Sequence, residues 1–266
     1  MYKLIAIDLD DTLLGEDLTI SERNINAIKV AVDKGVKVIL ASGRATPSVK
    51  PYLDILNLKI PLISYQGARI EDTFNNKTIY KKEIDKEVAL PIIKYAEQKN
   101  IHCNIYMDDV IYVEQINKWS DYYHNMSIFT SMEAVGKLSD FISASTTKII
   151  LIDEHEVLLK IKDEVTQLAG EHINVFFSKP NFLEFTNKSA TKGEAVKFVA
   201  DIFDIKQEEV IAIGDTYNDI PMISYAGLGV CVANGTEATK EIADYITLSN
   251  EEDGVAHVIE KYILEG

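Results

Sequence analysis

Short apolar runs that alternate with helix-forming stretches constrain the fold of this chain more than any other feature. Near the N-terminus, residues 3–9, 36–41 and 61–65 each have the length and apolar content of a buried strand. Helical stretches at about 19–35 and from 46 onward separate these runs. This order predicts a parallel sheet whose strands are joined by right-handed helical crossovers.

The first two helices carry start signals. Thr19 and Glu22 have the spacing of a capping box, so the first helix is expected to begin near Thr19 or Ser21. Thr46 followed by Pro47 has the pattern of an N-cap residue and a first helical turn. We therefore expect the second helix to begin there.

The pattern changes in the middle of the chain. A hairpin is expected at about 70–84, with Asn75-Asn76 as its turn. Helices at about 86–100 and 117–129 and a third ending near 169 then mix with strands, two of which flank Asp108-Asp109. Further strands are expected at 148–153, 174–178 and 182–186.

Beyond residue 187 the first pattern returns, with buried strands at 210–215 and 229–233 between helices. The sequence therefore predicts a doubly wound α/β core made of residues 1–82 and 188–266, and an inserted α+β domain at 83–187.

Composition restricts the possible partners. The 266 residues are 47% hydrophobic, enough for a sizeable core, and 27 basic against 42 acidic residues give a net charge of −15. Such a chain repels nucleic acids and anionic membranes. A small anionic substrate remains compatible with it, because a bound metal ion and a few local cations can dominate a pocket.

Segments that would place the protein outside the cytoplasm are not expected. The N-terminal run is too short and too acidic for a signal peptide, and no run has the length of a membrane span. Cys103 and Cys231 lie in apolar strand-like segments and are expected to be buried free thiols, although one disulfide is possible. The five histidines show no ligand spacing.

Polar residues follow three of the predicted parallel strands. Asp8 and Asp10 follow the first, Ser42 the second and Asp215 a later one, while Lys192 lies at the start of a helix. In an open parallel sheet these positions meet beyond the carboxyl ends of the strands, where ligands bind. Carboxylates, a hydroxyl, a cation and free backbone N–H groups suit a phosphate and a hard divalent cation.

The charges suggest a role for each residue. Asp8, held against Mg²⁺, would stay ionised and act as the nucleophile, while Asp10 could swing to act as general acid and then base. Asp215 would supply a further oxygen to the ion. Lys192 and Ser42 would hold the phosphoryl oxygens, because phosphoryl transfer depends chiefly on positioning and neutralised charge.

These motifs resemble those of a known family. DLDDTLL, the Ser42 segment ASGR, the Lys192 segment TKGEA and GDTYNDIPM resemble, in order, the four motifs of the haloacid dehalogenase superfamily. The form of the fourth motif and the large insert between the second and third are similar to the Cof-type phosphatases with a type II B cap. The resemblance covers the whole chain.

The resemblance implies a Rossmann-like core, a cap domain and a set of site residues. Asp8 would be the nucleophile and Asp10 the acid/base, with Mg²⁺ on Asp8, the Asp10 carbonyl and Asp215, and with Asp219 supporting the metal site. Implied phosphate contacts come from the Leu9 backbone, Ser42, Gly43, Lys192 and Asn218. One departure is Gln66-Gly67-Ala68, where relatives usually have Asn-Gly-Ala, and this leaves the substrate-side contacts near Gln66 open.

Other side chains have two possible roles. Arg44, Arg69, Glu184 and Asn187 could contact the leaving group, or could have ordinary solvated or hinge roles. A further group of aromatic side chains is expected to form the core of the insert, with pocket lining as the alternative: Trp119, Tyr122, Tyr123 and Phe129.

The sequence thus predicts a magnesium-dependent phosphatase, monomeric or homodimeric, that hydrolyses small phosphorylated metabolites, foremost sugar phosphates, through an aspartyl-phosphate on Asp8. A phosphomutase is disfavoured, because residues 13–41 leave no room for a helical lid between the first two motifs. A non-catalytic switch phosphorylated on Asp8 is the second class considered, but there the acid at Asp10 would have no evident task. A third, the phosphorylation unit of an ion pump, is opposed by the lack of membrane spans.

Overall fold

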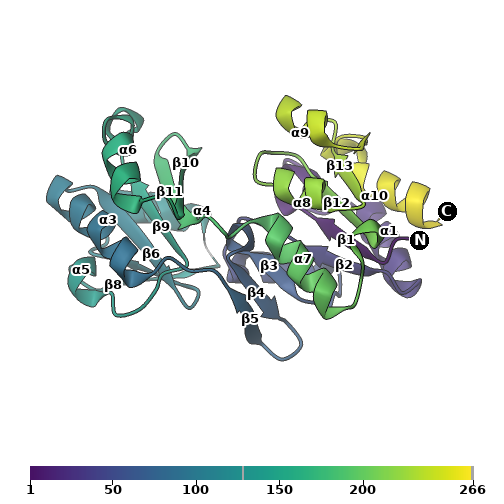
Figure 1. The fold of residues 1–266 in the computed structure, drawn as a ribbon, viewed down its shortest axis with the longest axis horizontal. Helices are drawn as coiled ribbons and strands as arrows, with labels where there is room; N and C mark the ends of the chain where they lie inside the picture. Colours follow the sequence, from purple (N-terminus) through teal and green to yellow (C-terminus); the bar gives the residue numbers. More distant parts are fainter. Residues whose placement is uncertain (128, 265–266) are drawn as a thin grey trace. The chain divides into compact units, whose positions relative to one another are not determined.

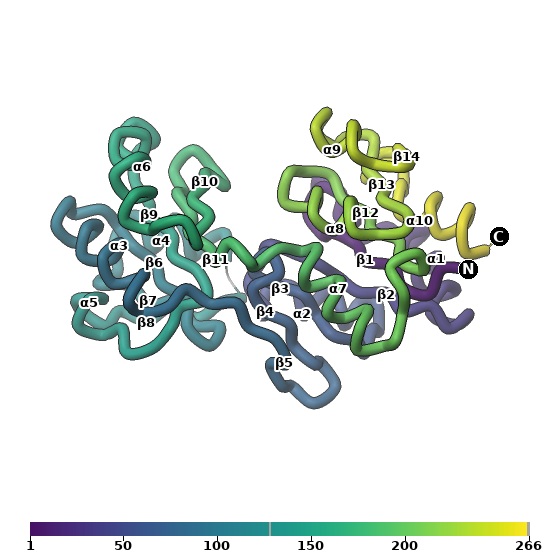
Figure 2. Tube along the Cα trace, viewed as in Figure 1, coloured from purple at the N-terminus to yellow at the C-terminus, as the bar shows by residue number. Residues whose placement is uncertain are grey.

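The computed structural model describes residues 1–127 and 129–264. The chain forms two compact units, one of Met1–Tyr80 with Thr191–Gly266 and one of Lys81–Ala190. The second unit contains the whole of the insert that the sequence leads us to expect at 83–187. Both ends of the chain belong to the first unit (Figure 2).

A five-stranded parallel sheet forms the centre of the first unit, in the order β14-β13-β12-β1-β2 (Figure 1, Figure 2). Every neighbouring pair in it is parallel, which confirms the predicted α/β class. Its strands are β1 (Leu4–Ile7), β2 (Lys37–Leu40), β12 (Val210–Gly214), β13 (Leu228–Cys231) and β14 (Tyr245–Ile246).

The two central strands of this sheet are fully apolar and buried over their whole length. Ile5 lies opposite Ile211 on one side and Val38 on the other, so β1 has a strand on each edge. All residues of β1 and β12 are buried. Burial on both faces explains why these strands appear in the sequence as continuous apolar runs instead of alternating ones.

Helices and a second small sheet complete the first unit. The helices are α1 (Glu22–Asp33), α2 (Thr46–Ile55), α7 (Lys192–Ile202), α8 (Ile220–Tyr225), α9 (Glu237–Ile242) and α10 (Gly254–Ile259). The small sheet has the order β3-β4-β5 and consists of β3 (Leu62–Ser64), β4 (Arg69–Asp72) and β5 (Lys77–Lys81). The predicted hairpin corresponds to β4 and β5.

The first two helices begin where the sequence predicts, but Thr19 and Thr46, the expected capping residues, do not cap them. The N-cap of α1 is Ser21, whose Oγ accepts from the backbone of Asn24, while Thr19 instead binds the carboxylate of Asp17. Two candidate caps lie two residues apart, and the backbone places only Ser21 within reach of the free N–H groups.

The N-cap of α2 is Ala45, and Thr46 is already inside the helix. The Thr46 hydroxyl is buried and hydrogen-bonded to Ser64 on β3, at 2.9 Å. A tertiary contact between helix and strand therefore engages the side chain that the sequence pattern assigned to capping.

The second unit is a six-stranded sheet in the order β10-β11-β9-β6-β7-β8. It is antiparallel except for the pairing of β7 with β8. Its strands are β6 (His102–Met107), β7 (Val110–Val113), β8 (Ser131–Ala134), β9 (Lys148–Ile152), β10 (Ile173–Lys179) and β11 (Phe182–Asn187). Its helices are α3 (Lys86–Lys99), α4 (Lys118–Met126), α5 (Leu138–Phe141) and α6 (His155–Ala169).

The second unit has a hydrophobic core of its own, in which Ile105, Leu151 and Phe185 are completely buried. Asp108 and Asp109 form the predicted two-residue turn between β6 and β7, with φ of 47° and 65°. The short β8 and α5 were not predicted, because four residues each give no clear periodic signal.

The expected aromatic core of the insert is only partly confirmed. Tyr123 is buried, but Tyr122 and Phe129 are 44% and 54% exposed. Both lie in or just beyond the short helix α4, which buries only Ser120 and Tyr123. Apolar content alone therefore overestimated how much of this segment is buried.

Both cysteines are buried free thiols, as expected. Within residues 1–127 and 129–264, no helix combines the length and the apolar character that a bilayer crossing requires.

Candidate active site

The ends of neighbouring parallel strands bring the first site residues together. Asp8 directly follows β1, and Asp215 directly follows β12, its partner in the sheet. Ser42 lies just after β2 on the other side of β1. Because parallel strands end at the same edge, these three residues share one edge of the sheet.

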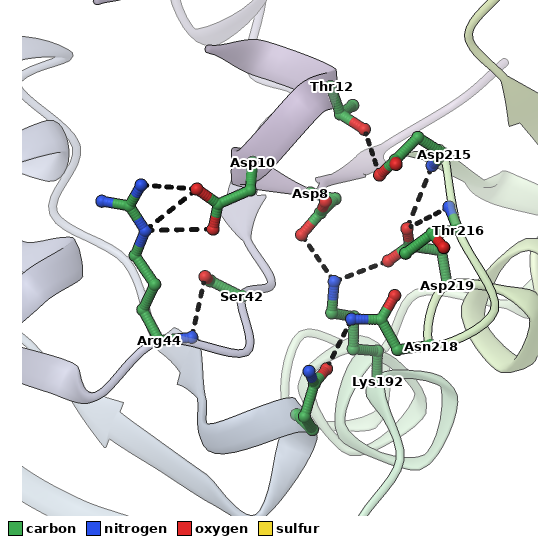
Figure 3. Close-up of polar contacts among 11 residues, drawn as sticks. Asp8, Asp10, Thr12, Ser42, Arg44, Lys192, Asp215, Thr216, Asn218 and Asp219 are labelled. Carbon is green, nitrogen blue, oxygen red and sulfur yellow. Dashed lines mark hydrogen bonds and ion pairs between the residues drawn. The ribbon is translucent and has the colours of Figure 1, made fainter. Parts of the chain in front are cut away.

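Lys192 supplies the positive charge. Thr191 caps α7 by accepting from the backbone of Glu194, and Lys192 is therefore the first residue of this helix. Lys192 is 1% exposed, and its ammonium lies 2.5 Å from Asp8 Oδ1 and 2.6 Å from Asp219 Oδ1 (Figure 3). One cation thus joins residues from the first and fourth motifs.

The loop after β12 fixes Asp219 by a second set of contacts. Asp219 Oδ2 accepts from the backbone N–H groups of Asp215 and Thr216, at 3.0 and 3.1 Å. A Cβ on Gly214 would lie 2.5 Å from the Asp219 side chain, so only glycine allows this close approach. Both Asp219 oxygens are therefore engaged by the protein.

Thr12 is a site residue to which the sequence assigned no role. Its hydroxyl donates to Asp215 Oδ1 at 3.1 Å and is completely buried. The signal was present, because Thr12 is the last residue of the first motif. A turn after β1, in which Asp11 has φ of 56°, returns Thr12 to the sheet edge.

Asp10 does not join the other acids. Its carboxylate forms a two-point ion pair with Arg44, whose Nη2 and Nε lie 2.5 and 3.0 Å from the two oxygens. Figure 3 shows this carboxylate turned toward Arg44. The Asp10 side chain is 45% exposed, and Arg44 also packs on the ring of Tyr52. In this conformation the Asp10 carboxylate therefore lies apart from the cluster of Asp8, Asp215 and Asp219.

The remaining predicted site residues belong to the second motif and to the loop of the fourth motif. Ser42 is buried, and its hydroxyl accepts from the backbone N–H of Arg44 at 3.1 Å. Asn218 donates from Nδ2 to Gln66 Oε1 at 2.8 Å. Gly43 lies against the same Gln66 side chain.

The electrostatics of the site are dominated by an excess of negative charge. Burial, followed by the charge of Asp219, raises the pKa of Asp8 well above its ordinary value. The same two causes raise the pKa of Asp215 to about 7. Burial lowers the pKa of Lys192, but Asp219 and Asp8 more than offset this, so the net pKa is raised.

The acids fit a divalent cation. Asp8, Asp215 and Asp219 each offer an oxygen within 4.8 Å of the others, and a single ammonium offsets their charge. Carboxylate oxygens are the ligands that Mg²⁺ prefers. Since Asp219 is engaged through both oxygens, Asp8 and Asp215 are the two carboxylates best placed to hold the ion directly.

The structure thus brings most of the predicted residues to one sheet edge in the first unit. Asp8, Lys192, Asp215 and Asp219 form one connected cluster, and Ser42 follows the neighbouring strand. Leu9 follows Asp8 and is buried. Gly43 lies against the Gln66 side chain, and Asn218 is hydrogen-bonded to that side chain. Arg69 and Glu184 are instead paired with other charged side chains, Glu71 and Lys148 respectively.

Comparison with known proteins gives full-length matches. A family model described as haloacid dehalogenase-like hydrolase matches residues 5–259. The chain is 31% identical to the 5-amino-6-(5-phospho-D-ribitylamino)uracil phosphatase YwtE of Bacillus subtilis, with 98% of each chain covered. The structure of TM0651 from Thermotoga maritima has a TM-score of 0.91 at 34% identity, covering 98% of this chain and 97% of that one. The HAD subclass IIB sugar phosphatase BT4131 has a TM-score of 0.83 at 26% identity, with 98% of both chains covered.

Proposed function

The chain belongs to the haloacid dehalogenase-like hydrolases, as a phosphatase of the Cof type, and from this premise we propose a magnesium-dependent enzyme that hydrolyses small phosphate monoesters through an aspartyl-phosphate on Asp8. One observation carries the proposal. Asp8 is buried at the end of a central strand, beside one ammonium and two further carboxylates.

In the first half-reaction, an Asp8 carboxylate oxygen attacks phosphorus and the bond from phosphorus to the ester oxygen breaks. The leaving alkoxide takes a proton from Asp10. Lys192 holds a phosphoryl oxygen while keeping Asp8 in position, and the Ser42 hydroxyl and the Gly43 backbone assist. Water has little access to Asp8, which is 4% exposed.

In the second half-reaction, Asp10 acts as a base. Its carboxylate takes a proton from water, the water oxygen attacks the phosphorus of the aspartyl-phosphate, and inorganic phosphate leaves while the Asp8 carboxylate is restored. Arg44 holds Asp10 with two hydrogen bonds on the rim of the site. Rotation of the Asp10 side chain away from Arg44 would bring it toward the ester oxygen.

Asp8 and Asp215 would hold Mg²⁺, with the Asp10 carbonyl as a third ligand and Asp219 supporting them. The bound ion supplies positive charge that offsets the phosphoryl oxygens and the excess of carboxylates. Thr12 and the loop backbone keep Asp215 and Asp219 oriented for this purpose.

Sugar phosphates are the proposed substrates. The names of two similar proteins describe a phosphatase for a phosphorylated ribityl compound and a sugar phosphatase. The insert at 83–187 has its own core, and we propose that it is the cap domain that selects the organic part of the substrate.

The direct test is hydrolysis of 4-nitrophenyl phosphate with Mg²⁺, with chelator, and in Asp8→Asn. Activity should disappear in the last two cases. Asp11→Asn is the matched control, because Asp11 is an exposed acid in the same turn whose positive φ suits asparagine. A fully active Asp8→Asn variant would refute the proposal, whereas lasting phosphorylation of Asp8 without turnover would favour a switch.

A further inference from the structure

Three successive residues beside the site have left-handed backbone conformations. Tyr65, Gln66 and Gly67 have φ of 52°, 59° and 92°. Such angles cost free energy for residues with a side chain, and they persist only where the surrounding structure determines them. The turn at 65–67 is therefore held in place by its neighbours.

Those neighbours are segments of the candidate active site. The backbone N–H groups of Tyr65 and Gln66 donate to the carbonyls of Arg44 and Ser42, at 2.9 and 3.1 Å. A Cβ on Gly67 would lie 2.2 Å from the carbonyl oxygen of Thr191, the cap of the helix that starts with Lys192. The turn thus contacts both the second and the third motif.

The Gln66 side chain adds a contact to the fourth motif. Its Oε1 accepts from Asn218 Nδ2 at 2.8 Å. A Cβ on Gly43 would lie 2.3 Å from Gln66 Nε2, so the absence of a side chain at 43 makes room for this amide. The other end of the Asn218 amide is unusual, because its Oδ1 is buried and finds no hydrogen-bond partner within residues 1–127 and 129–264.

We propose that Gln66 is a positioning residue that sets the direction of the Asn218 amide for the phosphoryl group. This inference rests on the proposed function, in which Asn218 contacts phosphate. A phosphoryl oxygen only accepts hydrogen bonds, so Asn218 must present Nδ2 to it. Gln66 carries both a donor and an acceptor, so the two amides can reverse together, with Gln66 Nε2 then donating to Asn218 Oδ1.

This reversal accounts for the buried amide oxygen that lacks a partner within the described part of the chain. It gives the buried Asn218 Oδ1 a partner, and it frees Asn218 Nδ2 for the anion. It also explains why a strained turn is kept at 65–67, since the turn carries Gln66 to a place between Gly43 and Asn218. A leucine or methionine side chain would fill the same space but could not direct the amide.

The test compares Gln66→Met with the wild type, using inorganic phosphate as a competitive inhibitor of 4-nitrophenyl phosphate hydrolysis. Methionine keeps the length and bulk of glutamine but loses the hydrogen bond. We expect the inhibition constant of phosphate to rise about tenfold, the equivalent of one hydrogen bond to a charged group. The change should fall on this constant and on KM more than on kcat.

A double-mutant cycle separates positioning from general damage. In an Asn218→Ala background, Gln66→Met should cause no further rise in the inhibition constant, because Gln66 acts through Asn218. If Gln66→Met folds poorly, Gln66→Leu, which is also uncharged and cannot form the hydrogen bond, serves in the same cycle. A Gln66→Met inhibition constant equal to that of the wild type, or the same rise with and without Asn218, overturns the inference. If either of these results occurs while Asp8→Asn is inactive, only this inference fails. Activity in Asp8→Asn would instead overturn the proposed function.

Discussion

At the scale of single residues, Lys192 is the group on which the acids of the site depend. Its ammonium is the cation between Asp8 and Asp219, and all three side chains are at most 5% exposed. Removing one partner from a buried ion pair is more destabilising than replacing the whole pair, because a buried charge is left without compensation.

Lys192→Ala should therefore affect both catalysis and stability. We expect slower turnover, a higher KM and a loss of about 3 kcal/mol in the free energy of unfolding when Mg²⁺ is chelated. Steady-state kinetics and urea unfolding with chelator measure these effects. Lys197→Ala, on the exposed face of the same helix, is the matched control and should resemble the wild type. Equal kinetics in Lys192→Ala and the wild type would contradict a role for Lys192 in catalysis.

Asp10 is expected to matter for proton transfer and little for packing. Its side chain is 45% exposed, and its ion pair with Arg44 lies at the rim of the site. Asp10→Asn should lower kcat for an alkyl phosphate by about 10²- to 10⁴-fold, because the leaving alkoxide is then not protonated.

Two measurements check the Asp10 prediction. Thermal unfolding of Asp10→Asn should follow that of the wild type closely, since exposed ion pairs add little stability. The loss in kcat should also be smaller with 4-nitrophenyl phosphate, whose leaving group needs no proton. Wild-type turnover of an alkyl phosphate by Asp10→Asn would contradict the acid/base role.

At the scale of elements, the start of α1 offers a direct comparison of two candidate caps. Ser21 Oγ accepts from the backbone of Asn24 and also bonds to Asp253, whereas the Thr19 hydroxyl donates to Asp17 at the surface. Ser21→Ala should lower the free energy of unfolding by about 1–2 kcal/mol, and Thr19→Ala by less than about 0.5 kcal/mol. Urea titrations measure both. A larger loss in Thr19→Ala than in Ser21→Ala would instead support the capping box of Thr19 and Glu22.

His102, on strand β6, should make the stability of the protein depend on pH. His102 is buried and bonds to Asn104 and Asn117. Burial lowers the pKa of His102 to about 4, although the bond to Asn104 opposes this shift. The unfolded chain, with a histidine pKa near 6.5, therefore binds a proton before the folded one does, and stability falls as the pH decreases from about 6.5 to 4.

The size and the origin of this pH dependence can both be measured. A difference of about 2.5 pKa units corresponds to a loss of about 3 kcal/mol in the free energy of unfolding by pH 4. Urea unfolding between pH 7 and pH 4 should show a shallower decline in His102→Gln than in the wild type. His172→Gln changes an exposed histidine and is the control. Identical slopes in His102→Gln and the wild type would exclude His102 as the origin.

The elements also show how far the sequence could lead. Strand ends that carry Asp8 and Asp215 were predictable, because apolar runs buried on both faces are conspicuous and their carboxyl ends must meet. The pairing of Asp10 with Arg44 was not, because a long side chain can reach several partners across a gap that only tertiary structure defines. The proposed role of Gln66 depends on a left-handed turn, which could not be predicted because Tyr65 and Gln66 are not residue types that favour a positive φ.

At the scale of the whole molecule, two hydrophobic cores divide the chain. The two ends of the second unit are held together, because Asn187 Nδ2 donates to the carbonyl of Glu83 at 2.8 Å. Ile84 also forms a bridge to Thr146 inside the unit. The insert thus closes on itself where the chain enters and leaves.

A fragment of residues 81–190 should therefore fold alone. We expect a cooperative urea transition and near-ultraviolet circular dichroism typical of fixed aromatic packing, since the fragment retains its own core. Leu151→Ala, at a fully buried position of that core, should weaken the fragment by about 2–5 kcal/mol. A gradual, non-cooperative transition in the unaltered fragment would show that the insert requires the rest of the chain.

The unequal numbers of carboxylates and ammonium groups beside Asp8 have a consequence for ligand binding. Without a metal ion, a phosphate dianion would enter a region that is already negative and would be repelled. With the ion present, each ligand attracts the other, and thermodynamic reciprocity requires the two affinities to rise by the same factor. A titration of either ligand alone would therefore understate its affinity in the working enzyme.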